Sequence, residues 1–74
     1  MSQIIVLDVR GLEAPEPLER VLDALSTLAP GDSLRMLIDR EPRPLYRILE
    51  RNGYRFQAEA HEGGLFEILI RHGA

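Results

Sequence analysis

The spacing of the apolar residues predicts two helices. Over residues 16–28 apolar side chains recur every three or four positions, which makes one stripe of an amphipathic helix. The stripe consists of Leu18, Val21, Leu22, Leu25 and Leu28. A shorter helix is expected from about Pro42 or Pro44 to Arg51, with its apolar residues turned inward. Those inward residues are Leu45, Ile48 and Leu49.

Four further segments have the pattern of strands. Residues 3–9 form an apolar, β-branched run, which predicts a strand buried on both faces or nearly so. Residues 33–38 and 54–60 alternate apolar and polar side chains, as half-buried strands do. A glycine-containing hairpin turn over residues 61–64 then leads into a last strand over residues 65–70.

The elements follow one another in the order β-α-β-α-β-β, which predicts a single domain over residues 1–74. The first three strands are expected to run in the same direction, so right-handed crossovers place both helices on one face. We therefore expect an α+β fold: a two-layer α/β sandwich with a four-stranded mixed sheet and both helices on one face. The last strand is expected to lie antiparallel beside the third.

The other face of the sheet has no predicted cover. The first strand has apolar residues in both phases, so either Ile4 and Val6 or Ile5 and Leu7 point away from the helices. A homodimer through this face or through a sheet edge is one expectation. The alternative is that these are isolated exposed apolar side chains, which are common on protein surfaces.

Charge and composition narrow the classes of function. The net charge is −3, so we expect no nucleic-acid partner. The absence of cysteine excludes disulfides, thiol catalysis and thiolate metal sites. No signal peptide or membrane span is visible, so we expect a bacterial cytoplasmic protein with no membrane partner. Neither His61 nor His72 stands in a ligand spacing with Asp or Glu, so no metal, cofactor or catalytic residue is expected.

Three segments carry a family resemblance. Leu7–Leu18 (LDVRGLEAPEPL) resembles the signature of the TusA/SirA sulfur carriers, in which Asp-x-Arg-Gly-Leu leads to Cys-Pro-x-Pro at the start of the first helix. Residues 29–34 (APGDSL) are similar to their Pro-Gly-Glu-x-Leu entry into the second strand. A closer similarity is to an uncharacterised sister family without this cysteine, which has a loop like Asp-His-Asp-Pro-x-Pro-Leu after the second strand. Here residues 39–46 read DREPRPLY, with Arg40 where histidine is frequent.

The resemblance covers nearly the whole chain and implies the same fold. It also implies a setting in redox or nitrogen-oxide metabolism, since members of the sister family occur alone or fused to other domains, hemerythrin-like ones included. Ala14 stands at the position of the carrier cysteine, where no persulfide can form. Direct sulfur transfer by this chain is thereby excluded.

The first and the last of these segments, over residues 11–17 and 39–46, also supply the candidate site. Each follows a parallel strand, and the carboxyl ends of such strands commonly hold a ligand. The candidate ligand- or partner-binding residues are Arg10, Glu13, Ala14, Pro15, Asp39, Arg40, Glu41, Pro42 and Arg43.

Three functions fit these residues. The leading one is a non-catalytic binding or regulatory domain with an unknown protein partner. The second is a small-anion or metabolite binder that uses Arg10, Arg40, Arg43 and two helix N-termini. The third is an accessory subunit of sulfur transfer.

Each cluster of arginines also has a plainer interpretation. The candidate arginines of the two loops can pair with neighbouring carboxylates, and Arg10 is expected to pair with Asp8 in this way. The basic stripe Arg43, Arg47 and Arg51 can dock a nucleic-acid phosphate backbone or an acidic protein. Alternatively, the stripe is a solvated face, or it faces the acidic residues of the first helix.

Overall fold

One mixed sheet is the base of the fold. The computed structural model describes residues 2–73. Its elements are β1 (Ile4–Asp8), α1 (Glu16–Ser26), β2 (Ser33–Ile38), α2 (Arg43–Arg51), β3 (Tyr54–Ala60), a short 3-10 turn (Glu62–Gly64) and β4 (Phe66–His72). The strand order is β1-β2-β4-β3. β1 and β2 are parallel, and β4 is antiparallel to both of its neighbours, β2 and β3.

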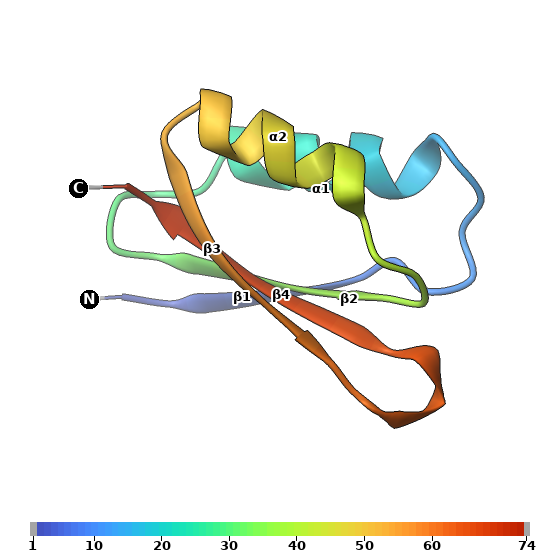
Figure 1. Cartoon of the computed structure of the whole chain (residues 1–74). Helices are drawn as coiled ribbons and strands as arrows, with labels where there is room; N and C mark the ends of the chain where they lie inside the picture. The colour runs from blue at the N-terminus through green and yellow to red at the C-terminus, as the bar shows by residue number, and fades with distance from the viewer. Residues whose placement is uncertain (1, 74) are drawn as a thin grey trace.

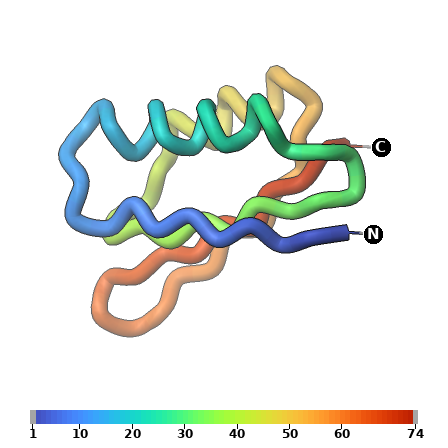
Figure 2. Tube along the Cα trace, turned by 180° about the vertical axis from the view of Figure 1, so that it is seen from behind, coloured from blue at the N-terminus to red at the C-terminus, as the bar shows by residue number. Residues whose placement is uncertain are grey.

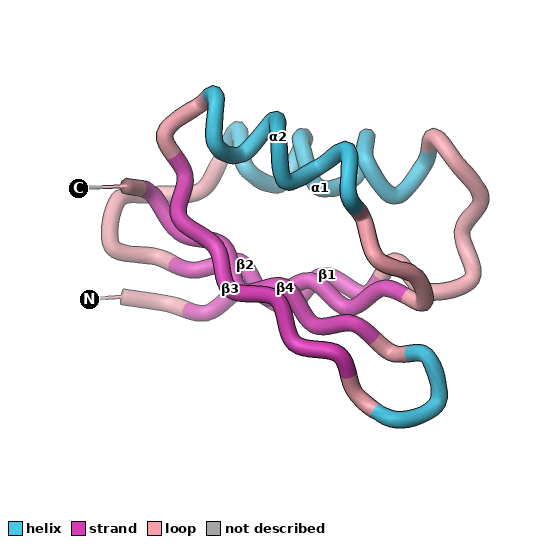
Figure 3. The backbone as a smooth tube through the Cα atoms, in the orientation of Figure 1, coloured by secondary structure: helices cyan, strands magenta, loops and turns pink. Residues whose placement is uncertain are grey.

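Both helices lie on one face of this sheet, and the other face is open (Figures 1 and 3). The first three strands run in the same direction, and the last strand is antiparallel beside the third. The predicted α+β sandwich of order β-α-β-α-β-β is therefore confirmed. The longest helix has 11 residues, and no helix in the described part of the chain is long and apolar enough to cross a membrane.

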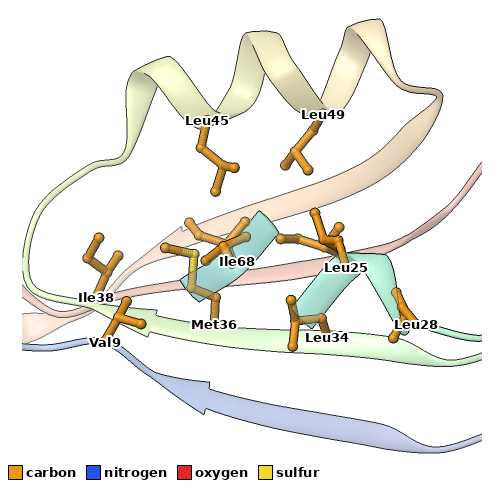
Figure 4. Close-up of a cluster of buried hydrophobic side chains, with 11 residues drawn as sticks. Val9, Leu25, Leu28, Leu34, Met36, Ile38, Leu45, Leu49 and Ile68 are labelled. Atoms are coloured by element: carbon orange, nitrogen blue, oxygen red, sulfur yellow. The ribbon is translucent and has the colours of Figure 1, made fainter. Parts of the chain in front are cut away.

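The core lies between the helices and the two central strands. Alternate residues of β2 and β4 point towards the helices, because side chains of a strand alternate between its faces. The helices contribute residues from one stripe each (Figure 4). The main buried side chains are Val21, Leu25, Leu34, Met36, Ile38, Leu45, Leu49, Ile68 and Ile70. Tyr46 of α2 also stacks on Phe56 of β3, with ring centroids 4.9 Å apart, and so ties the second helix to the edge of the sheet.

The prediction that the first strand is buried on both faces is wrong. β1 is an edge strand, and its side chains Ile4 and Val6 are 66% and 58% exposed. Both lie on the open face, since their neighbours in β2 are Ser33 and Arg35. An apolar run indicates a strand, but it does not indicate which faces of that strand another layer covers. Ile4 and Val6 are exposed because both helices lie on the other face of the sheet.

Smaller differences concern the helix stripes and the element ends. Leu22 is 39% exposed and Ile48 is only half-buried, so neither belongs to the buried core. α1 ends at Ser26, whereas Leu28 is buried in the turn that follows. The last strand continues to His72, two residues beyond its predicted end, because that residue pairs with Tyr54 of β3.

Candidate functional site

A pocket of about 290 Å³ lies between the segment that leads into α1 and the loop that follows β2. Because β1 and β2 are parallel neighbours, both segments begin at the same end of the sheet, where the carboxyl ends of these two strands lie. The predicted juxtaposition of the two loops is therefore confirmed. We call this site the proline pocket. Its lining consists of Ala14, Pro15, Pro17, Leu18, Met36, Ile38, Arg40, Glu41, Pro42, Pro44 and Leu45.

Two hydrogen bonds join the two segments on either side of the proline pocket. The backbone N–H of Gly11 donates to Asp39 Oδ2 at 2.9 Å. Arg40 Nη2 donates to the carbonyl oxygen of Leu12 at 2.7 Å. Each bond connects residues 28 positions apart in the sequence, so the two loops are held against each other. Gly11 has a φ of +81°, a conformation that residues with a side chain rarely adopt.

The arginines beside the pocket are largely engaged with nearby acceptors. Arg10 Nε and Nη2 donate to the two carboxylate oxygens of Asp8, at 2.9 and 2.7 Å. Arg43 Nε donates to Glu41 Oε1 at 3.0 Å. At Arg10 and Arg43 the geometry thus favours the ion-pair interpretation over an anion site.

The helix N-termini at the pocket also offer few donors to an anion. At α2, the N–H of Arg43 bonds to the Glu41 carbonyl, Pro44 has no N–H, and the N–H of Leu45 bonds to the Pro42 carbonyl. α1 is similar, because its first turn also contains a proline and its Glu16 N–H bonds to a preceding carbonyl. A helix N-terminus attracts anions through unpaired N–H groups. The prolines therefore make this an apolar site.

The Asp8–Arg10 pair makes the stability of the protein depend on pH at low pH. The Arg10 side chain and backbone N–H donate to Asp8 and lower the pKa of its carboxyl from 3.8 to about 2. A folded-state pKa below the unfolded one stabilises the protein above about pH 4, and this contribution is lost as the pH falls through about 2. Asp8→Asn should therefore flatten the pH dependence of the urea midpoint between about pH 4 and 2.

The exposed Asp23 of α1 provides the control for this prediction, because it has no ion pair among the described residues. Asp23→Asn should leave the pH dependence of the urea midpoint close to that of the wild type between about pH 4 and 2. Equal flattening by both variants would contradict a specific role of the Asp8–Arg10 pair.

Five of the nine sequence-predicted site residues line the proline pocket: Ala14, Pro15, Arg40, Glu41 and Pro42. Asp39 instead joins the loops, and Arg10 and Arg43 are in ion pairs. Glu13 is exposed, and its carbonyl oxygen accepts the Glu16 N–H.

The sequence interpretation missed the floor of the pocket. Met36 and Ile38 were assigned only to the second strand, yet they also line the proline pocket. The alternation of apolar residues along this strand could have indicated this role. It continues to the carboxyl end of the strand, where the loop of the candidate site begins.

The basic stripe of α2 does not pair with α1. In the described part of the chain, the ion pairs include none between Arg43, Arg47 or Arg51 and an acidic residue of α1. Glu16 of α1 pairs instead with Arg20 of the same helix. Among the described residues, the stripe therefore forms no ion pair with the acidic residues of α1, contrary to the interpretation that it pairs with them. At the start of α2, burial and the neighbouring Glu41 raise the pKa of Tyr46.

His61 has acidic neighbours that its sequence position did not suggest. The hairpin brings its Nε2 within 3.1 Å of Glu67 Oε1 and 3.7 Å of Glu59 Oε2. These three residues offer ligand atoms that lie within 4.8 Å of one another. Arg35, however, already pairs with Glu67 and lowers the pKa of its carboxyl. The cluster is thus a partly neutralised charge network on the open face of the sheet.

Comparisons with known proteins agree with this architecture. No curated protein matches the chain. A crystal structure of a SirA-like protein from Desulfitobacterium hafniense matches with a TM-score of 0.78 and 26% identity, over 100% of both chains. Residues 6–72 match the model of a family described as "Uncharacterized conserved protein (DUF2249)". The chain therefore belongs to this DUF2249 family and has a SirA-like fold.

Proposed function

We propose that this protein is a non-catalytic interaction module whose protein partner inserts an apolar side chain into the proline pocket. The observation that carries the proposal is the apolar lining of that pocket at the edge of the sheet. Its volume of about 290 Å³ is at the low end for small-molecule sites and suits one or two large apolar side chains. Apolar anchors in a desolvated pocket dominate the energy of many protein interfaces.

Two features favour this function over the alternatives. The lining residues include no serine, threonine, cysteine, histidine or lysine, and the carboxylate of Glu41 in this lining is paired with Arg43. The arginines expected to bind an anion donate instead to carboxylates and to a carbonyl oxygen. Arg40 and Glu41 at the pocket offer polar contacts around an apolar anchor, as the rim of an interface does.

The family resemblance suggests the kind of partner. A cysteine-bearing sulfur carrier or a protein of redox or nitrogen-oxide metabolism is the first to test, and a cytoplasmic setting is part of the same proposal. Ala14 stands where such carriers have their cysteine, so a partner that docks here transfers no sulfur to this protein.

The proposal is tested with a library of random 12-residue peptides displayed on phage and selected on the wild-type protein. Enriched peptides should share a large apolar residue. Ala14→Arg places a long charged side chain at the pocket and should weaken peptide binding about 10- to 100-fold. Burying one large apolar side chain of the peptide contributes about 1.5–3 kcal/mol, and the variant removes this contribution.

Ala29→Arg is the matched control, because Ala29 is also an exposed loop alanine but follows the other end of α1. It should leave the affinity unchanged. Peptides that bind the Ala14→Arg variant as tightly as the wild type, or a selection that enriches no apolar anchor, would overturn the proposal.

A further inference from the structure

The free edge of β1 has an unusual surface. Three of the four large apolar side chains that are exposed among the described residues lie on this strand: Ile4, Ile5 and Val6. Figure 2 shows β1 (blue) running along the near edge of the sheet with no segment beyond it. The opposite edge strand, β3, instead has polar side chains at every second position: Arg55, Gln57 and Glu59.

The direction of the β1 backbone groups follows from two hydrogen bonds. The Gln3 carbonyl accepts from the Ser33 N–H, and the Val9 N–H donates to the Leu37 carbonyl. In a parallel pair, the N–H and C=O of a given residue point to the same side, and successive residues alternate. The odd-numbered residues of β1 therefore bond to β2, whereas the N–H and C=O groups of Ile4, Val6 and Asp8 point to the free edge.

Proteins usually protect such an edge with lysine, proline, a bulge or a covering segment. Residues 3–7 of this chain contain no charge and no proline. Unpaired backbone groups and exposed β-branched side chains thus coincide on one uncharged strand.

We propose that β1 pairs with β1 of a second copy of this chain, antiparallel about a two-fold axis at Ile5, to form a continuous eight-stranded sheet. A second copy suits the edge because an uncharged segment meets itself without like-charge repulsion. The axis at Ile5 sets Ile4 opposite Val6 of the second copy, so apolar residues meet on the open face. An axis at Val6 would instead set Asp8 opposite Ile4.

This register specifies the hydrogen bonds. Ile4 and Val6 of the second copy form a hydrogen-bonded pair, because the N–H and C=O groups of both residues point to the edge. Ile5 lies opposite its own copy in a non-hydrogen-bonded pair, with Cα atoms about 4.5 Å apart. The two proline pockets then lie at opposite ends of the dimer and both stay accessible. One short strand pair buries less surface than a permanent interface, so the dimer is weak and depends on concentration.

The first test is sedimentation velocity over a concentration series. The wild type should shift from monomer to dimer, and Val6→Lys should weaken the dimer at least about tenfold, because it places two charges at the apolar contact. Gln57→Lys on the open face of the other edge strand is the matched control and should leave the dimer intact. Both side chains are exposed, so the monomer fold is retained.

The second test uses the absence of cysteine from the natural chain. Ile5→Cys should form an intermolecular disulfide on mild oxidation, since the expected Cα separation suits such a bond. Leu22→Cys is the control, because Leu22 is 39% exposed and Ile5 is 38% exposed. A wild type that stays monomeric at millimolar concentration would overturn the proposal. So would a dimer unaffected by Val6→Lys, or cross-linking of Ile5→Cys no faster than that of Leu22→Cys.

Discussion

Leu49→Ala is expected to lower the free energy of unfolding by about 3 kcal/mol, within the range of about 2–5 kcal/mol for buried leucines. Leu49 is 0% exposed and points from α2 into the core (Figure 4). Its truncation removes apolar contacts and leaves a cavity that a short helix between two fixed ends closes poorly. A chain of 74 residues has a total stability of about 4–11 kcal/mol. This one change therefore removes a large share of it.

Urea denaturation followed by circular dichroism measures this loss. Leu22→Ala is the matched control, because it removes the same atoms from a helix but at a position that is 39% exposed. Its cost should stay below about 1 kcal/mol, as is usual for surface positions. Similar losses of unfolding free energy for the two variants would contradict the structure, in which Leu49 is buried and Leu22 is exposed.

Substitutions of Gly53 are expected to have the second-largest effect. Gly53 follows α2 with a φ of +76°, where a side chain is disfavoured by its own backbone. A Cβ at this position would meet no heavy atom within 4 Å, so the cost comes from the backbone conformation alone. Gly53→Ala should cost about 1–2 kcal/mol, and Gly53→Val up to about 3 kcal/mol.

Gly53→Asn is the internal control of this series. Asparagine tolerates the left-handed conformation better than alanine does, so its cost should be the smallest of the three. The midpoint of thermal or urea unfolding should therefore be highest for Gly53→Asn, lower for Gly53→Ala and lowest for Gly53→Val. Equal effects of Asn and Ala, or no loss with Val, would contradict a left-handed backbone at this turn.

The fold was predictable because its signals are local. Proline and glycine end the elements, and the two apolar periods distinguish helices from strands. Residues 33–38 and 54–60 are strands with the predicted bounds. The two predicted helices form as well, although Ile48 lies only half-buried at the margin of its stripe.

The candidate site was predictable in place but not in chemistry. The order of strand, loop and helix brings the two loops to one edge, as the pocket confirms. For the arginines there, the sequence favoured pairing with nearby carboxylates over an anion site, but it did not indicate an apolar pocket. The structure pairs Arg10 with Asp8 and Arg43 with Glu41, and the prolines remove N–H donors. What lies open between the loops is therefore apolar.

By itself the sequence determined the elements, the two-layer order and the lack of a thiol at Ala14, because each follows from residue type and spacing. Only the tertiary structure decided that Ile4 and Val6, and not Ile5 and Leu7, lie on the open face, since this depends on which face of the sheet the helices cover. It also decided the lining of the proline pocket, which joins residues from two distant segments. Contacts between such segments have no periodic signal in the chain, so they emerge only when the sheet brings them together.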